Sequence, residues 1–236
     1  MIPRIILVHG LGAHQDRWTF LENYCRKHKI QTTALNIPAT LPLVEWLDVI
    51  AEKHAALLKA NKNQPIYICG ESLGGLMAYR YAQKPKTKPC AGLILISPAF
   101  KSKLQFSIWE YGAIVLGSIF PFFKIKAHFS AAMCTSDTSY QKSMQASKKE
   151  TRSFSPRLFI AIAWQQILAT IMTPPKLRTI MLLAGQDVMV DTQTSIRIAQ
   201  KRKYTYKVYP QMRHALSIEK ERVTVFRDIV AWIQGA

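Results

Sequence analysis

The chain has 236 residues, of which 49% are hydrophobic, and a formal net charge of +18 from 32 basic and 14 acidic side chains. A chain of this length and composition can bury the core of one domain, which excludes a disordered protein and gives no reason to expect a second domain. The charge predicts attraction to an anionic surface. Because no nucleic-acid-binding motif accompanies the charge, we expect this surface to be phospholipid rather than nucleic acid. The alternative is that the charge serves solubility.

Short apolar runs alternate with helical patterns along most of the chain. This alternation predicts βαβ units and therefore an α/β fold, in which helices flank a mostly parallel sheet. The expected strands, in chain order, are residues 5–8, 31–36, 66–69, 92–96, 179–183 and 204–209. Two expected helices have apolar residues mainly on one face, namely Leu43, Leu47, Ile50, Leu57 and Leu58 in the first, and Val223, Phe226, Ile229, Val230 and Ile233 in the second.

The alternation breaks at residues 101–175, which we expect to form a helical cap or lid inserted into a core made of residues 1–100 and 176–236. Within this insertion, the apolar stretch 111–123 is followed by Lys124, Lys126 and His128. The stretch is too short to span a bilayer as a helix. It suits a cap over an apolar pocket or a contact with the membrane interface, and ordinary packing onto the core is the alternative.

A glycine-flanked serine occurs in the stretch 67–75, Y-I-C-G-E-S-L-G-G, where an expected strand passes into a helical pattern. In this context G-x-S-x-G is typical of a nucleophile elbow, in which Gly70 and Gly74 leave room for a sharp turn that exposes the hydroxyl of Ser72. Amides at the start of the next helix favour a developing negative charge. Ser72 is therefore the candidate nucleophile.

Two residues further along the chain could activate this serine. A serine hydroxyl needs a base to take its proton, and the base needs a group that orients it. His214 is the candidate base, because it follows the last expected strand in a loop. Asp187 is the candidate orienting acid, just beyond the end of another expected strand, and Asp191 is the alternative acid.

The stretch V-H-G-L-G at residues 8–12 ends the first expected strand and suggests an anion site. A tetrahedral intermediate has a negative oxygen that needs two hydrogen-bond donors. The backbone amides of Leu11 and Leu73 are the candidates for this oxyanion hole, and we expect the ring of His9 to fix the loop. The other histidines expected at structural or solvated positions are His14, His28, His54 and His128.

Together these motifs, in the order Ser, Asp, His, resemble the α/β-hydrolase family, and more narrowly its monoacylglycerol lipase and lysophospholipase branch. The resemblance covers nearly the whole chain. The residues that carry it are 9–14, 17–18, 70–75, 135–137, 140, 155–164, 185–187, 214 and 219. It implies an α/β-hydrolase fold with Ser72 as nucleophile, His214 as base, Asp187 as orienting acid, and the amides of Leu11 and Leu73 as oxyanion donors.

Two departures from the family pattern bear on the expected structure. Residues 36–40, N-I-P-A-T, replace an R-G-H-G-type turn, so the resemblance implies less about the substrate than about the reaction. The chain also starts at the strand that normally follows an antiparallel hairpin, so the sheet is expected to have about six strands.

These observations predict a carboxylic ester hydrolase that needs no cofactor or metal. The resemblance implies a small acyl ester as substrate, a lipid with a single acyl chain of the monoacylglycerol or lysophospholipid type, cleaved through an acyl-serine intermediate. One alternative is a thioesterase or a small amide or peptide hydrolase on the same triad, because one fold hosts many chemistries. Another is a basic membrane-binding module without catalysis.

The four cysteines, Cys25, Cys69, Cys90 and Cys134, form no C-x-x-C pair and have no histidine at metal-ligand spacing. We therefore expect buried free thiols rather than a zinc site or a disulfide framework. The first apolar run is too short for a signal peptide. We expect a cytoplasmic protein. Peripheral contact of this protein with an anionic membrane is the further possibility that the charge raises.

Overall fold

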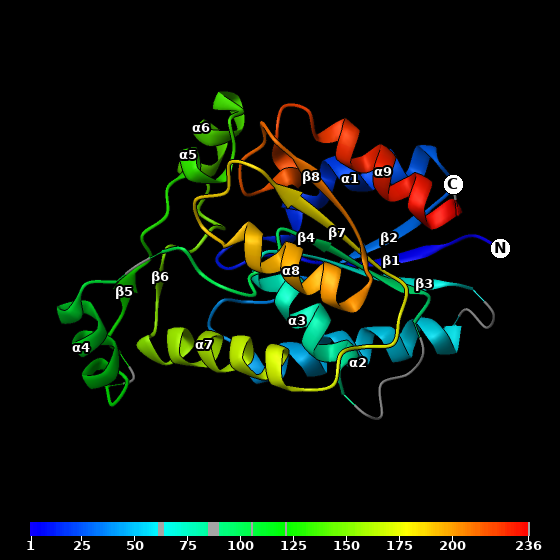
Figure 1. Ribbon diagram of the computed structural model, residues 1–236. Helices are drawn as coiled ribbons and strands as arrows, with labels where there is room; N and C mark the ends of the chain where they lie inside the picture. Colours follow the sequence, from blue (N-terminus) through cyan, green and yellow to red (C-terminus); the bar gives the residue numbers. More distant parts are fainter. Residues whose placement is uncertain (61–63, 85–89, 105, 121, 236) are drawn as a thin grey trace.

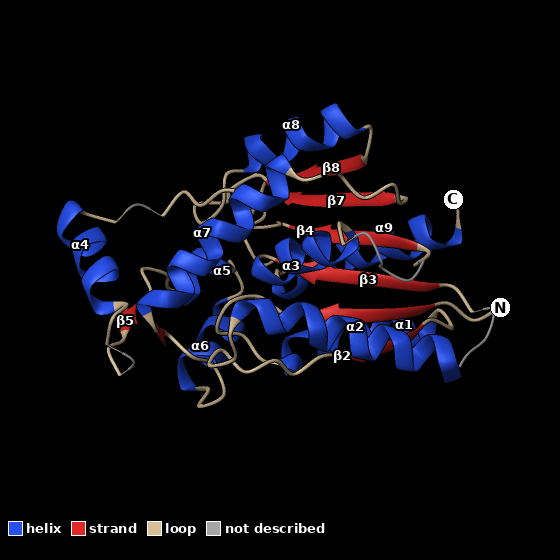
Figure 2. Cartoon of the chain, turned by 90° about the horizontal axis from the view of Figure 1, so that it is seen from below, coloured by secondary structure: helices blue, strands red, loops and turns tan. Residues whose placement is uncertain are grey.

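The computed structural model describes residues 1–60, 64–84, 90–104, 106–120 and 122–235. A parallel sheet with the strand order β2-β1-β3-β4-β7-β8 forms its centre (Figure 1, Figure 2). The strands of this sheet are β1 (Arg4–Val8), β2 (Gln31–Ala34), β3 (Ile66–Glu71), β4 (Gly92–Ile96), β7 (Thr179–Ala184) and β8 (Thr205–Tyr209). The expected mostly parallel sheet of six strands flanked by helices is confirmed.

Helices cover both faces of the sheet, so the central strands are buried on both sides and are apolar almost throughout. Alternate residues of β1 face opposite layers: Ile6 and Val8 pack with one set of helices, and Ile5 and Leu7 with the other. On the first face lie α2 (Leu43–Ala60), α3 (Leu73–Ala82), α7 (Pro156–Ile171) and α8 (Thr192–Arg202). On the second face lie α1 (Thr19–Lys27) and α9 (Arg222–Gln234), and two short 3-10 helices, η1 (Gln15–Trp18) and η2 (Leu216–Ile218), join loops near α1 and α9.

The strand order places a crossover point between β1 and β3. The chain leaves β1 for β2 on one side and then returns to β3 on the other, which opens a crevice at the carboxyl ends of β1 and β3. In the register of this pair, Val8 lies beside Gly70. The residues that follow each of them, the V-H-G-L-G loop and the G-x-S-x-G turn, are therefore neighbours although about 60 residues separate them.

The insertion lies between β4 and β7, at the carboxyl end of the sheet and away from both chain termini (Figure 1, Figure 2). It contains α4 (Ile108–Gly117), β5 (Ile125–Lys126), α5 (Ala131–Cys134), α6 (Thr138–Ala146), β6 (Ser153–Phe154) and α7. Strands β5 and β6 form a small antiparallel sheet that the sequence did not predict. Helix α7 packs against α3 of the core and against α4.

Two details of the expected elements differ in the structure. Strand β2 ends at Ala34 rather than at residue 36, because the chain turns there so that the amide of Ile37 reaches Nε2 of His9 at 3.1 Å. In the last helix Val223 is 51% exposed, whereas Val225 is fully buried, so the apolar face of α9 begins two residues later than expected.

Candidate active site

Ser72 occupies a strained turn between β3 and α3. Its φ of 57° and ψ of −120° are unfavourable for a residue with a side chain, at a cost of about 1–3 kcal/mol. Hydrogen bonds from its amide to the carbonyl of Ile96 (2.9 Å) and from Ala99 to its own carbonyl (3.0 Å) hold the turn in place. A Cβ on Gly74 would collide with the carbonyl of Val8, so glycine is required there by the close approach of α3 to β1.

His214 and Asp187 form a buried pair. Nδ1 of His214 lies 2.7 Å from Oδ2 of Asp187, and both side chains are almost fully inaccessible. The other carboxylate oxygen, Oδ1, accepts the amides of Met189 (2.8 Å) and Val190 (2.9 Å). Burial raises the pKa of Asp187, but the nearby His214 and these hydrogen bonds outweigh it, so the pKa lies below its ordinary value and the carboxylate is ionised at neutral pH.

The pairing with Asp187 fixes the direction of the imidazole. An ionised carboxylate accepts the proton on Nδ1, which leaves Nε2 as an acceptor in the neutral ring. Nε2 is buried and has no hydrogen-bond partner among the residues that the structure describes. It is therefore available to a donor on the cavity side, where Ser72 also lies.

One cavity of about 410 Å³ has both Ser72 and His214 in its wall. Gly10, Leu11 and Leu73 line the same wall, so the predicted nucleophile, base and oxyanion donors meet at one place. Away from them the cavity is bounded mainly by apolar side chains of the insertion, among them Phe106, Ile114, Val115, Phe129, Phe159 and Ile162. A largely apolar pocket with a few convergent polar groups is the usual form of a small-molecule site.

His9 fixes the loop after β1. Its Nε2 accepts the amide of Ile37 (3.1 Å), so Nδ1 carries the proton and donates to the carbonyl of Gly10 at 2.9 Å. The ring is 1% exposed and packs edge-on against Trp46. Burial lowers the pKa of His9, which keeps the ring neutral and suits this arrangement. The expected structural role of His9 agrees with these contacts.

A partly buried ion pair lies in the wall of the cavity, and the sequence did not reveal it. Nη2 of Arg17 lies 2.7 Å from Oε1 of Glu150, and the two side chains are 10% and 13% exposed. Nε of Arg17 is buried without a hydrogen-bond partner in the described part of the chain. Glu71 also lines the cavity, and its carboxylate accepts the amide (3.1 Å) and the hydroxyl (2.9 Å) of Ser217.

The remaining candidates lie elsewhere. Asp191 caps the first turn of α8, where Oδ1 accepts the amides of Gln193 and Thr194, whereas the carboxylate that His214 contacts is that of Asp187. The four cysteines are buried and free, as expected. Within the described ranges, no group of three or more His, Cys, Asp or Glu side chains could hold a metal ion.

The fold and its crossover site define the class of protein: a serine hydrolase of the α/β-hydrolase fold. A family model described as serine aminopeptidase, S33 matches residues 44–221, and the chain belongs to this family. The phospholipase YtpA of Bacillus subtilis (strain 168) is 24% identical over 94% of this chain and 92% of its own.

Solved structures agree with this fold. The crystal structure of a monoacylglycerol lipase of Paleococcus ferrophilus superposes with a TM-score of 0.86 at 20% identity, covering 98% of this chain and 95% of that one. A soluble variant of monoglyceride lipase from Saccharomyces cerevisiae, in complex with a substrate analogue, superposes with a TM-score of 0.83 at 19% identity. The match covers 100% of this chain and 87% of that one. With the family, these relatives confirm the expected enzyme class, a carboxylic ester hydrolase of the lipase and esterase type.

Proposed function

We propose that the enzyme hydrolyses the ester of a lipid with one acyl chain, of the monoacylglycerol or lysophospholipid type, through an acyl-serine intermediate. The observation that carries the proposal is the apolar cavity of about 410 Å³ with Ser72 and His214 in its wall. Such a cavity buries one acyl chain and brings its carbonyl to the serine. The names of the phospholipase and monoacylglycerol lipase relatives support the same substrate class.

In the first half of the proposed reaction, Nε2 of His214 takes the proton from Ser72 as Oγ attacks the ester carbonyl. The new C–O bond places negative charge on the carbonyl oxygen, which the amides of Leu11 and Leu73 stabilise. Asp187, ionised and 2.7 Å from Nδ1, stabilises the imidazolium. Protonated His214 then gives its proton to the leaving alcohol as the ester C–O bond breaks.

In the second half, water replaces the alcohol. His214 takes a proton from the water, whose oxygen attacks the acyl-serine carbonyl, and the same two amides hold the second oxyanion. Collapse of this intermediate returns the proton to Oγ of Ser72 and releases a fatty acid. The free enzyme is regenerated without a cofactor.

Two kinds of side chain in the cavity lining suit the two parts of such a substrate. We propose that the insertion, residues 101–175, is the cap that supplies the apolar walls for the acyl chain. Arg17 and Glu150 are among the polar residues of the wall and suit the hydroxyls of a head group. Because a guanidinium and a carboxylate offer donors and acceptors together, they favour a polar head group over a second acyl chain.

The variant Ser72→Ala tests the reaction. We expect loss of fluorophosphonate labelling and a fall in ester turnover of about a million-fold, since the covalent step is removed. Ser195→Ala is the matched control, because Ser195 is a buried serine on α8 whose hydroxyl has no hydrogen-bond partner among the described residues. Full turnover by Ser72→Ala would reject the proposed nucleophile.

The substrate class is tested separately on the wild-type enzyme. Monoacylglycerols and lysophospholipids of graded chain length are compared with acyl-CoA and with aminoacyl anilides. We expect the highest kcat/KM for a single-chain oxygen ester, rising with chain length until the cavity is filled. A preference for acyl-CoA would instead indicate a thioesterase, and a preference for anilides a peptide hydrolase, with the same triad.

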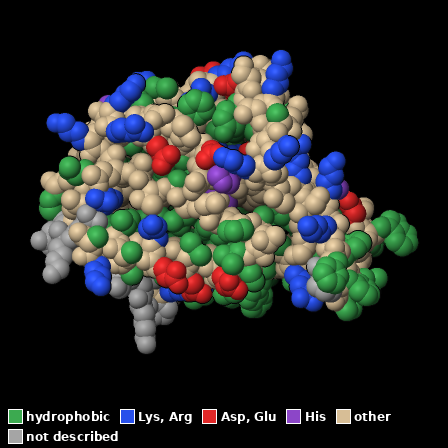
Figure 3. Space-filling view, turned by 180° about the vertical axis from the view of Figure 1, so that it is seen from behind, with side chains coloured by type: hydrophobic (Ala, Val, Ile, Leu, Met, Phe, Trp, Pro, Cys, Tyr) green, Lys and Arg blue, Asp and Glu red, His purple; other side chains and the backbone are tan. Residues whose placement is uncertain are grey.

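We also propose that the enzyme works at an anionic membrane surface, to which the insertion binds. Exposed apolar residues gather on α4, where Ile108 is 81% and Trp109 85% exposed, and continue on α7 with Trp164 at 56%. Figure 3 shows hydrophobic side chains at the end of the molecule that α4 occupies, with Lys and Arg beside them. Lys124, Lys126 and Arg157 are exposed in the same region. Apolar side chains next to basic ones are typical of an interfacial contact.

Sedimentation with vesicles tests this contact. We expect binding to vesicles that contain phosphatidylserine, weaker binding to pure phosphatidylcholine, and loss of the difference at high salt. Trp109→Ser is expected to weaken binding, whereas Val44→Ser, which changes an exposed apolar residue on α2, is the control. Equal binding of both variants and wild type would count against the insertion as the contact. In the described part of the chain no helix is long and apolar enough to cross a membrane.

A further inference from the structure

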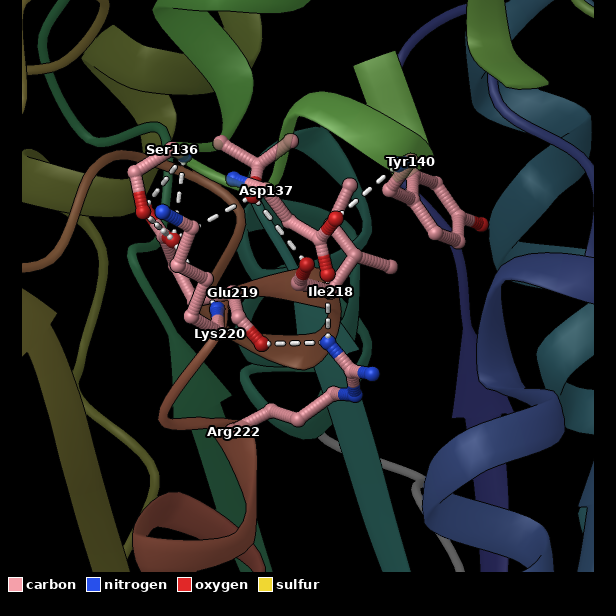
Figure 4. A network of polar contacts seen from close by, with 8 residues as sticks. Ser136, Asp137, Tyr140, Ile218, Glu219, Lys220 and Arg222 are labelled. Carbon is pink, nitrogen blue, oxygen red and sulfur yellow. Dashed lines mark hydrogen bonds and ion pairs between the residues drawn. The ribbon is translucent and has the colours of Figure 1, made fainter. Parts of the chain in front are cut away.

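Glu219 is a fully buried acid in the loop that carries His214, and the proposed reaction does not use it directly. Its Oε1 accepts the amide of Arg213, the residue before His214, at 2.8 Å. Its Oε2 accepts the hydroxyl of Ser136 at 2.6 Å, and the Ser136 amide lies 3.1 Å from both oxygens. The hydroxyl of Thr135 lies 3.2 Å from Oε2. The amide of Lys220 also lies 3.2 Å from Oε2, and Figure 4 shows Ser136 and Lys220 around the Glu219 carboxylate.

A buried carboxylate is costly unless donors surround it. Here the donors come from two separate parts of the molecule: the loop around His214, and the turn between α5 and α6 in the insertion. Glu219 thus joins the two. Because these donors are themselves buried or half-buried, removing the carboxylate leaves several polar groups unsatisfied at once.

The backbone on both sides of His214 is fixed against the insertion. On one side, the amide of Arg213 is bound by Glu219; on the other, the amide of Ala215 donates to the carbonyl of Cys134 at 2.8 Å. Cys134 ends α5 and directly precedes Thr135. The position of the imidazole between Asp187 and the cavity therefore depends on this junction as well as on the bond to Asp187.

We propose that Glu219 is a positioning residue for His214. Its carboxylate holds the backbone before the base against the α5–α6 turn, so that Nδ1 stays aligned with Asp187 while Nε2 faces the cavity. The inference rests on the proposed function, in which His214 is the base. A small displacement of a catalytic group lowers the rate strongly even where binding is unchanged.

The test compares Glu219→Gln with Asp137→Asn. Glutamine has nearly the same shape but replaces one acceptor oxygen with a donor, which opposes the amide and hydroxyl donors. Asp137 lies in the same network, where its side chain pairs with Arg222 at 3.0 Å and accepts the amide of Tyr140, whereas the amide of Arg213 is bound by Glu219. Asparagine at 137 can still accept the amide of Tyr140 and so preserve the start of α6.

Turnover of a soluble short-chain p-nitrophenyl ester is measured per active site, counted by fluorophosphonate titration. We expect Glu219→Gln to lower kcat by about ten- to a hundred-fold with little change in KM. Asp137→Asn should stay within about twofold of wild type, because a partly exposed ion pair contributes little.

A wild-type kcat in Glu219→Gln would overturn the inference, and so would a loss that lies in KM rather than in kcat. An equal loss in Asp137→Asn would also overturn it, because the effect would then follow from any loosening of the insertion. If Glu219→Gln fails to fold, the variant Ser136→Ala replaces it, because this variant removes only the hydroxyl donor at 2.6 Å. We expect Ser136→Ala to lower kcat by about two- to ten-fold. An unchanged kcat in Ser136→Ala would overturn the inference. Ser72→Ala distinguishes failure of the two proposals. If Ser72→Ala remains active, the proposed function is rejected. If Ser72→Ala is inactive and Glu219→Gln has the activity of wild type, only the role of Glu219 is rejected.

Discussion

Glu71 binds Ser217 through both carboxylate oxygens: Oε1 accepts the backbone amide at 3.1 Å and Oε2 accepts the hydroxyl at 2.9 Å. Glu71 directly precedes the proposed nucleophile, and Ser217 lies three residues after the proposed base. Both side chains are buried. The two loops that carry Ser72 and His214 are therefore joined by this contact, independently of any bond between the serine and the histidine.

The burial of Glu71 gives a pH dependence of stability with a definite sign. Burial raises the pKa of Glu71 above its ordinary value of 4.5, although Arg17, His214 and the bonds from Ser217 oppose the shift. The folded protein therefore binds this proton more tightly than the unfolded chain does. Its stabilising effect is fully present below about pH 4.5 and is lost as the pH rises through the folded-state pKa.

Glu71→Gln isolates this effect. Glutamine can accept the Ser217 amide through its oxygen and donate to the Ser217 hydroxyl through its nitrogen, so the geometry is preserved. We expect the free energy of unfolding of wild type, minus that of Glu71→Gln, to increase as the pH falls from about 7.5 to about 5. Urea denaturation at both pH values measures it, and a decrease on acidification would contradict the prediction.

Asp187 and Asp191 are predicted to have different roles, which their asparagine variants distinguish. Asp187→Asn places a donor opposite Nδ1 of His214 and should lower kcat by about ten-thousand-fold. Asp191→Asn keeps a side chain that can cap α8 and should leave kcat nearly unchanged, with a loss of stability of less than about 1 kcal/mol. A larger loss of kcat in Asp191→Asn than in Asp187→Asn would reverse the assignment.

The sequence predicted the six-stranded sheet and the chain order of the candidate triad because these features depend on local patterns. A strand buried on both faces, such as Ile66–Glu71, is a nearly unbroken apolar run, and a glycine-flanked serine directly after it marks the elbow. The bounds were less accurate where tertiary contacts decide them, as at Ala34, beyond which the chain turns towards His9.

The polar contacts around the site could not be predicted in the same way. Arg17 and Glu150 are 133 residues apart, and Glu71 and Ser217 are 146 apart. Each of these side chains belongs to a residue type that is normally exposed. The packing of the insertion against the core brings Glu150 to Arg17, whereas the packing of two core loops brings Ser217 to Glu71. The exposure of the apolar residues on α4 could not be predicted either, because an apolar pattern in a sequence does not show whether another part of the protein covers those residues.

The cysteines give a prediction about chemical reactivity. Burial raises the pKa of Cys25 to about 12 and the pKa values of Cys90 and Cys134 to about 11, so few thiolates form near pH 8. We expect iodoacetamide to alkylate the native protein at least about a hundredfold more slowly than the urea-unfolded chain, with Cys134, which lines the cavity, reacting first. Mass spectrometry of tryptic peptides measures each rate, and rapid labelling of Cys25 in the native protein would contradict the assigned burial.

Gly74 and Gly112 are both helical glycines, but the structure predicts opposite effects of alanine. A Cβ at position 74 would overlap the carbonyl of Val8 and lie 2.5 Å from that of His9, so Gly74→Ala must push α3 away from β1. We expect a loss of stability of about 3 kcal/mol or more and of most esterase activity, because Ser72 directly precedes this helix. Gly112 lies on exposed α4, where an added Cβ would meet no described atom within 4 Å apart from its chain neighbours and the backbone of its own helix, so Gly112→Ala should stabilise the protein by up to about 1 kcal/mol. Thermal unfolding compares the two, and equal effects would show that the contact between α3 and β1 is looser than the distances indicate.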